Sequence, residues 1–98
     1  MNLSNAYEEK RNFIRMKMDS PLQLTLSDKT IEGVCIDLSG TGMCIELKEP
    51  LKIGSQAVVH LPSQQSQISA FNAIVRVNRV MEDGDLFYYG AEILELLS

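Results

Sequence analysis

Apolar and polar residues alternate along most of this chain, with the two-residue period of a half-buried β-strand. Residues 22–26 read Leu-Gln-Leu-Thr-Leu, and a polar turn at 27–29 separates them from a second run at 30–37. A third run follows at 43–47. Residues 13–18 alternate as well, which favours an extended segment over a helix. The first half of the chain therefore predicts strands joined by short turns.

The second half continues this pattern. A loop at 50–54 that contains proline and glycine precedes a short strand at 57–61, which a proline ends. After a polar loop, residues 68–81 form the longest predicted strand, and an Asp-Gly pair predicts a hairpin turn to a last strand at 86–94. Helical periodicity is almost absent. The pattern predicts an all-β chain folded as a small antiparallel barrel of five or six strands.

Composition limits the function classes. The chain has 98 residues, of which 45% are hydrophobic, enough for one domain with a single core. No apolar run approaches the ~18 residues of a membrane helix, and no signal segment follows the N-terminus, so we expect a cytoplasmic protein without membrane insertion. Cys35, Cys44 and His60 do not form a metal-ligand pattern, so we expect reduced core cysteines, no metal and no cofactor. Because no nucleophile elbow or catalytic carboxylate pair is present, we expect no enzymatic activity.

The charge is unevenly distributed. The net charge of the chain is −4, yet residues 1–18 carry four basic and two acidic side chains. This N-terminal segment would attract a small anion, whereas the acidic remainder would repel a long polyanion. The balance therefore argues against nucleic acid as a partner.

Two short motifs carry candidate chemistry. Arg11 and Arg15 form the pattern R-x-x-x-R, and Asp37, Ser39 and Gly42 form D-x-S-x-x-G. Arginine pairs bidentately with phosphate or with a guanine edge and stacks on bases. A carboxylate accepts from the donating edge of guanine, and glycine lets a backbone approach closely. Together the motifs supply what a guanine nucleotide needs.

This ordered pair of motifs resembles the PilZ family, bacterial modules that bind the second messenger cyclic di-GMP. The resemblance extends through the valine-rich strand at 70–80 and the closing Tyr-Gly-Ala-Glu-Ile at 89–93. It implies a six-stranded antiparallel split β-barrel over residues 11–98, preceded by a flexible tail at residues 1–10. Many family members continue into a C-terminal helix. Few residues follow position 93 here, so we expect little or no such helix. The barrel end could then be open, covered by the N-terminal segment, or capped by a second copy of the chain in a homodimer.

The resemblance also implies roles for the motif residues. Arg11 and Arg15 would clamp guanine edges and phosphates. Asp37 and Ser39 would face outward from the barrel and hydrogen-bond the nucleotide. Gly42 would serve either a backbone conformation closed to other residues or close approach of the ligand. The same Asp, Ser and Gly could instead form an ordinary turn between strands.

Further contacts are conceivable at Lys10, Asn12, Gly40 and Arg76. Lys10 adds charge before the first motif, and Gly40 lies inside the second. Arg76 and Arg79 on the long strand are weaker candidates for ligand contact, because no motif fixes their position. Arg76 is better explained as an exposed strand arginine.

The implied function is a cyclic di-GMP receptor. Binding would reorder the N-terminal arm and so alter a surface that an unidentified partner protein recognises. The alternative is a PilZ-type adaptor, for example in motility or pilus assembly, that needs no nucleotide.

Overall fold

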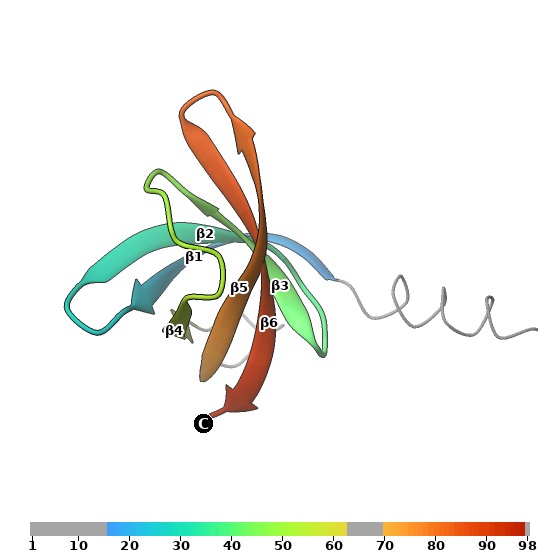
Figure 1. Ribbon diagram of the computed structural model, residues 1–98. Coiled ribbons are helices and arrows are strands. Elements are labelled where there is room, and N and C mark those ends of the chain that lie inside the picture. Colours follow the sequence, from blue (N-terminus) through green and yellow to red (C-terminus); the bar gives the residue numbers. More distant parts are fainter. Residues whose placement is uncertain (1–15, 63–69, 98) are drawn as a thin grey trace, which may run out of the picture.

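The computed structural model describes residues 16–62 and 70–97 of the chain. These residues form six strands: β1 (Met16–Thr25), β2 (Thr30–Leu38), β3 (Gly42–Leu47), β4 (Gln56–Leu61), β5 (Phe71–Asp83) and β6 (Leu86–Leu96). Every pair of neighbouring strands is antiparallel, and the strands close into a barrel in the order β1-β2-β3-β6-β5-β4 (Figure 1). The predicted all-β antiparallel barrel is confirmed, with six strands.

No helix occurs in the described part of the chain, so nothing in it could cross a membrane as a helix. Strand β6 runs to Leu96, two residues beyond the predicted end, in agreement with the expected lack of a C-terminal helix. The predicted tail at 1–10 and the motif residues Arg11 and Arg15 lie outside the described residues.

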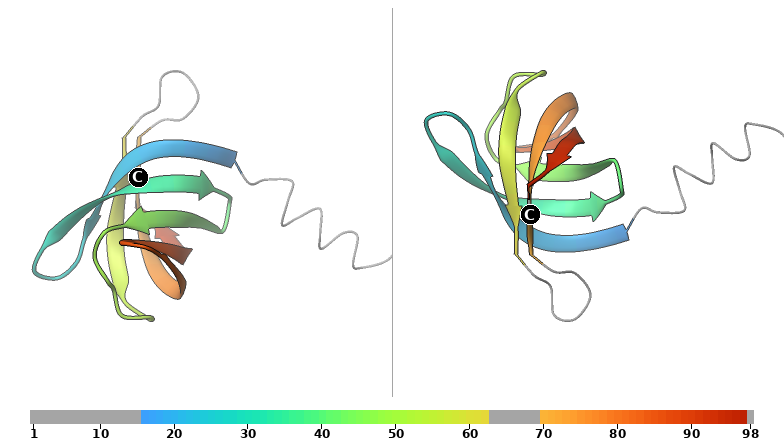
Figure 2. Two further views of the ribbon diagram at one scale, coloured as in Figure 1. Left: turned by 90° about the horizontal axis from the view of Figure 1, so that it is seen from above. Right: turned by 90° about the horizontal axis from the view of Figure 1, so that it is seen from below.

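Strand β1 is longer than the sequence pattern suggests, because it includes Pro21 without a break. β1 pairs with β2 along most of its length but with β4 only at Gln23–Thr25. Pro21 therefore lies where β1 has a neighbour on one side only, which is where a strand tolerates a residue without an N–H donor. β1, β2 and β3 lie side by side in both views of Figure 2.

The core confirms the alternation read from the sequence. Every second residue of β4 (Ala57, Val59 and Leu61) is buried, and β1, β3 and β5 follow the same rule. The core consists of Leu22, Leu24, Ile31, Cys35, Met43, Ile45, Leu47, Ala57, Val59, Leu61, Ala73, Val75, Val77, Tyr89 and Ala91. The hydroxyl of buried Tyr89 accepts a hydrogen bond of 2.6 Å from the backbone N–H of Leu51, which anchors the loop between β3 and β4.

Two of the register shifts in the sheet interrupt this alternation next to the pocket described below. The β2–β3 pairing shifts between Cys35 and Asp37, and the β5–β6 pairing shifts between Val77 and Arg79. Each shift leaves one extra residue unpaired, and one extra residue reverses which face the following side chains occupy. Cys35 and Val77 point into the core. Asp37 and Arg79, two residues later, therefore face outward.

The hairpin of β5 and β6 extends beyond the rest of the barrel (Figure 1). β4 pairs with β5 only as far as Arg76, whereas the β5–β6 pairing continues to Asp83 and Leu86. The two-residue turn begins at Gly84, whose φ of 65° favours glycine. This projecting hairpin forms one side of the pocket described next.

Candidate functional site

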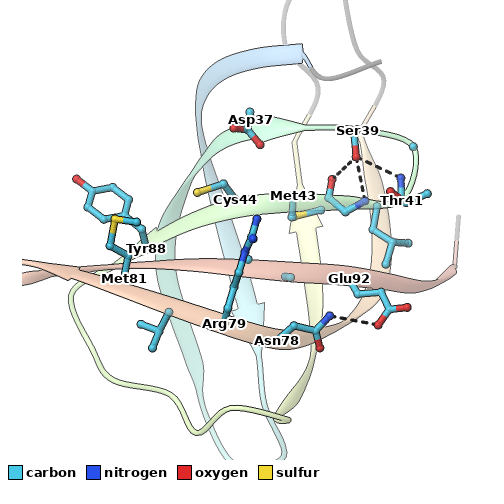
Figure 3. A pocket seen from close by; sticks show the side chains of 16 residues that line it. Asp37, Ser39, Thr41, Met43, Cys44, Asn78, Arg79, Met81, Tyr88 and Glu92 are labelled. Carbon is cyan, nitrogen blue, oxygen red and sulfur yellow. Dashed lines mark hydrogen bonds between the residues drawn. The ribbon is translucent and has the colours of Figure 1, made fainter. Parts of the chain in front are cut away.

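An open pocket of about 980 Å³ lies where the turn after β2 meets β3, β6 and β5 (Figure 3). Its volume is at the upper end of the ~300–1,000 Å³ range of small-molecule sites. Four residues singled out from the sequence line it together: Asp37, Ser39, Gly40 and Gly42. The D-x-S-x-x-G motif thus belongs to a concave surface large enough for a nucleotide.

The turn of this motif is held by the side chain of Ser39. Its hydroxyl donates to the carbonyl of Gly42 at 3.2 Å and accepts from the N–H groups of Thr41 and Gly42 at 3.3 and 3.2 Å (Figure 3). The backbone N–H of Ser39 also donates to the Gly42 carbonyl, at 2.8 Å. The single hydroxyl proton of Ser39 is used inside the turn, so this residue organises the loop that borders the pocket.

Gly42 is required by close packing of strands. An ideal Cβ at this position would lie 2.6 Å from the carbonyl oxygen of Ala91 on β6, and the φ of Gly42 is not in the left-handed region. The first explanation considered from the sequence, a conformation closed to other residues, is therefore wrong. Gly42 lets β3 approach β6 closely, and the adjacent Thr41 accepts a hydrogen bond of 2.9 Å from the N–H of Ile93.

The floor of the pocket is a row of paired residues that crosses four strands. Asp37 on β2 pairs with Cys44 on β3, and Cys44 pairs with Gly90 on β6. Gly90 pairs in turn with Arg79 on β5. Neighbouring strands lie about 4.8 Å apart, so this row covers about 14 Å of surface. It places a carboxylate at one end and a guanidinium at the other.

Arg76 has a different environment from that expected of a ligand contact. It does not line the pocket, and its Nη2 donates to Oε1 of Glu92 at 3.0 Å. Asn78 donates to the same oxygen at 3.3 Å. The hydrogen bonds from Arg76 and then Asn78 hold the pKa of Glu92 below its ordinary value. Glu92, which does line the pocket, is therefore an ionised and already paired carboxylate.

The two cysteines differ in environment. Cys35 is fully buried, and burial together with the nearby Asp37 carboxylate raises the pKa of its thiol to about 12. Cys44 is half-buried and lines the pocket. Neither forms a disulfide. The expectation of two core cysteines is thus correct for Cys35 only, because Cys44 falls on the outward phase of β3.

No group of three or more His, Cys, Asp or Glu side chains that could hold a metal ion occurs within residues 16–62 and 70–97. Lys10, Asn12 and the two motif arginines lie outside these ranges, so their positions relative to the pocket stay predictions.

Several pocket residues had no signal in the sequence: Asn78 from β5, Tyr88 and Glu92 from β6, and Cys44 from β3. Arg79 was a weaker candidate together with Arg76, and of these two only Arg79 lines the pocket. Arg79 faces the pocket because Asn78 has no register partner on β6 and forms a bulge there. Nothing in the sequence marks a bulge at that position.

Comparison with known proteins gives a consistent picture. The fold is similar to the solved structure titled "Structure of Bacillus subtilis Inhibitor of motility (MotI/DgrA)", with a TM-score of 0.74 and 13% sequence identity. The match covers 87% of this chain and 43% of that one, so this chain spans less than half of its neighbour's length. No curated protein matches the sequence. The family model described as PilZ domain matches residues 9–97, which includes both motifs and all six strands. The chain belongs to the PilZ domain family.

Proposed function

We propose that this domain binds cyclic di-GMP in the pocket beside the D-x-S-x-x-G turn, and that binding reorders the N-terminal arm to change a surface that a partner protein recognises. PilZ domains are binding or adaptor domains. The observation that carries the proposal is that the second motif lines an open pocket of about 980 Å³, where Asp37 faces outward beside the backbone of Gly40 and Gly42.

The start of β1 supports a meeting of the two motifs. Lys17 on β1 pairs with Asp37 on β2. Arg15 precedes Lys17 by two residues, and consecutive Cα atoms are about 3.8 Å apart, so the Cα of Arg15 must lie within about 7.6 Å of that of Lys17. This chain connection supports the proposal that Arg15 and Asp37 contact the same ligand.

Each residue then has a chemical role. Arg11 and Arg15 donate to phosphate and guanine acceptors as bidentate forks. Asp37 accepts from the guanine N–H groups. Ser39 and Gly42 act through the backbone, because Ser39 holds the turn and Gly42 permits its close contact with β6. The proposal thus assigns direct contacts to three residues and shaping of the turn to two.

The test is calorimetric titration with cyclic di-GMP, with single-stranded DNA as the control ligand. We expect Arg11→Ala and Arg15→Ala each to weaken binding at least tenfold, since a charge-assisted hydrogen bond is worth about 1.5–3 kcal/mol. Asp37→Ala is expected to weaken binding as well. Lys29→Ala is the matched control, because Lys29 pairs with Glu49 outside the pocket. Wild-type protein that fails to bind would refute the receptor function and favour the nucleotide-independent adaptor.

Reordering of the arm needs its own measurement. Trypsin should cut after Lys10, Arg11 or Arg15 more slowly when cyclic di-GMP is present, because the bound nucleotide would tie these side chains to the barrel. Amide exchange of β5, which is paired on both sides along much of its length, should change little and serves as the internal reference. Equal cleavage rates with and without ligand would contradict the switch while leaving binding intact.

A further inference from the structure

Arg79 lies in the pocket although it belongs to neither motif. The bulge at Asn78 turns it outward, and its register partner on β6 is Gly90. Figure 3 shows the Arg79 side chain crossing β6 toward β3, on the same side as Cys44 and Asp37. The guanidinium therefore projects over the floor of the pocket.

Gly90 makes this path available. An ideal Cβ at residue 90 would lie 2.6 Å from Nε and 2.9 Å from Cγ of Arg79, and its three nearest atoms all belong to that side chain. Any residue with a Cβ would have to push the arginine away. The aliphatic part of the Arg79 side chain thus packs against the backbone of Gly90, in space that a Cβ at residue 90 would fill.

The guanidinium has no partner of its own among residues 16–62 and 70–97. It makes no hydrogen bond and no ion pair there, in contrast to Arg76, which is three residues away and is held by Glu92. A guanidinium has five N–H donors in a fixed fork that matches a phosphate. The Glu92 carboxylate, which also lines the pocket, already accepts hydrogen bonds from Arg76 and Asn78, so it does not compete with a ligand for the Arg79 guanidinium.

We propose that Arg79 is a third arginine of the nucleotide site, which binds a phosphate of the dinucleotide from the side opposite Asp37, and that Gly90 is the residue that positions it. This inference rests on the proposed function. Asp37 and Arg79 stand at opposite ends of the four-strand row, about 14 Å apart along the surface by strand spacing, so one dinucleotide can contact both.

The experiment is titration of the full chain with cyclic di-GMP, using Arg79→Met, Arg79→Lys and Gly90→Ala. Arg79→Met is expected to weaken binding about 10- to 100-fold, the equivalent of one charge-assisted interaction. Arg79→Lys keeps the charge but not the fork, so its loss should be smaller. Lys52→Met is the matched control, because it removes the same charge from the β3–β4 loop outside the pocket and should leave affinity unchanged.

Gly90→Ala separates positioning from general damage. It is expected to weaken binding about as much as Arg79→Met, and the double variant Arg79→Met/Gly90→Ala should bind no more weakly than Arg79→Met alone, because the two changes act through one side chain. Thermal melts check that each variant folds. Because the clash involves only a flexible side chain, Gly90→Ala is expected to keep the wild-type melting temperature.

The outcomes are distinguishable. If wild-type protein binds and Arg79→Met binds equally well, the third arginine is refuted while the receptor function stands. If Gly90→Ala weakens binding equally in the wild-type and Arg79→Met backgrounds, the positioning role is refuted. If wild-type protein does not bind cyclic di-GMP, both the receptor function and this inference fall.

Discussion

Replacement of Gly42 by alanine tests whether this motif glycine is needed for close approach of strands. The new Cβ would lie 2.6 Å from the carbonyl oxygen of Ala91, which belongs to the backbone of the paired strand β6. Backbone cannot rotate away as a side chain can, so β3 and β6 must separate locally. Overpacking of this kind costs about 1–3 kcal/mol. For a domain of this size that lowers Tm by about 5–20 °C.

Gly84 provides the contrasting control. Its φ is +65°, but nothing lies within 4 Å of an added Cβ, so conformation is the sole demand on this residue. Asparagine tolerates the left-handed region better than other residues with a Cβ. We therefore expect Gly84→Asn to melt near the wild type, and Gly42→Asn to be at least as destabilised as Gly42→Ala, because a larger side chain meets the same oxygen.

Circular dichroism melts of the three variants measure this, and titration with cyclic di-GMP adds a functional readout. Because Gly42 lines the pocket, its alanine variant is expected to bind more weakly even below its melting temperature. A Gly42→Ala protein that melts with the wild type would show that β3 and β6 can separate at no cost, and the packing explanation would be wrong. Asparagine stabilising residue 42 relative to alanine would instead point to a conformational role.

Three further outcomes are expected. Ser39→Ala should cost about 1–2 kcal/mol in urea unfolding, because it removes the turn hydroxyl, whereas Ser39→Thr should retain most of the stability. The hydrogen bond from Arg76 holds the pKa of Glu92 below its ordinary 4.5, so this pair stabilises the fold above that pH and its contribution is lost as pH falls through the lowered pKa. Arg76→Leu should destabilise the fold at pH 7, and its effect should shrink as pH falls below 4.5. An effect that does not change with pH would contradict this. Alkylation at pH 8 should modify Cys44 and spare Cys35, whose buried thiol has a pKa of about 12, and cyclic di-GMP should protect Cys44, which lines the pocket.

The sequence by itself determined the strand content and the second motif's location. In a strand with one buried face, alternating apolar and polar residues can be placed in only one way, with the apolar side chains inward. The core positions of β4 and β5 therefore followed from the pattern. The spacing of D-x-S-x-x-G between two strand-like runs placed a turn at residues 38–42, where the structure has one. These features depend on neighbours along the chain, which the sequence contains.

Only the tertiary structure decided which charged side chains share the pocket. A bulge reverses the facing of every later residue in its strand, yet it depends on how two strands pair and leaves no composition signal. The bulge at Asn78 thus orients Arg79 toward the pocket, whereas Arg76 forms an ion pair with Glu92. The same holds for Gly42, whose lack of a side chain is explained by a backbone oxygen about fifty residues away in sequence, on a strand that only folding brings next to it.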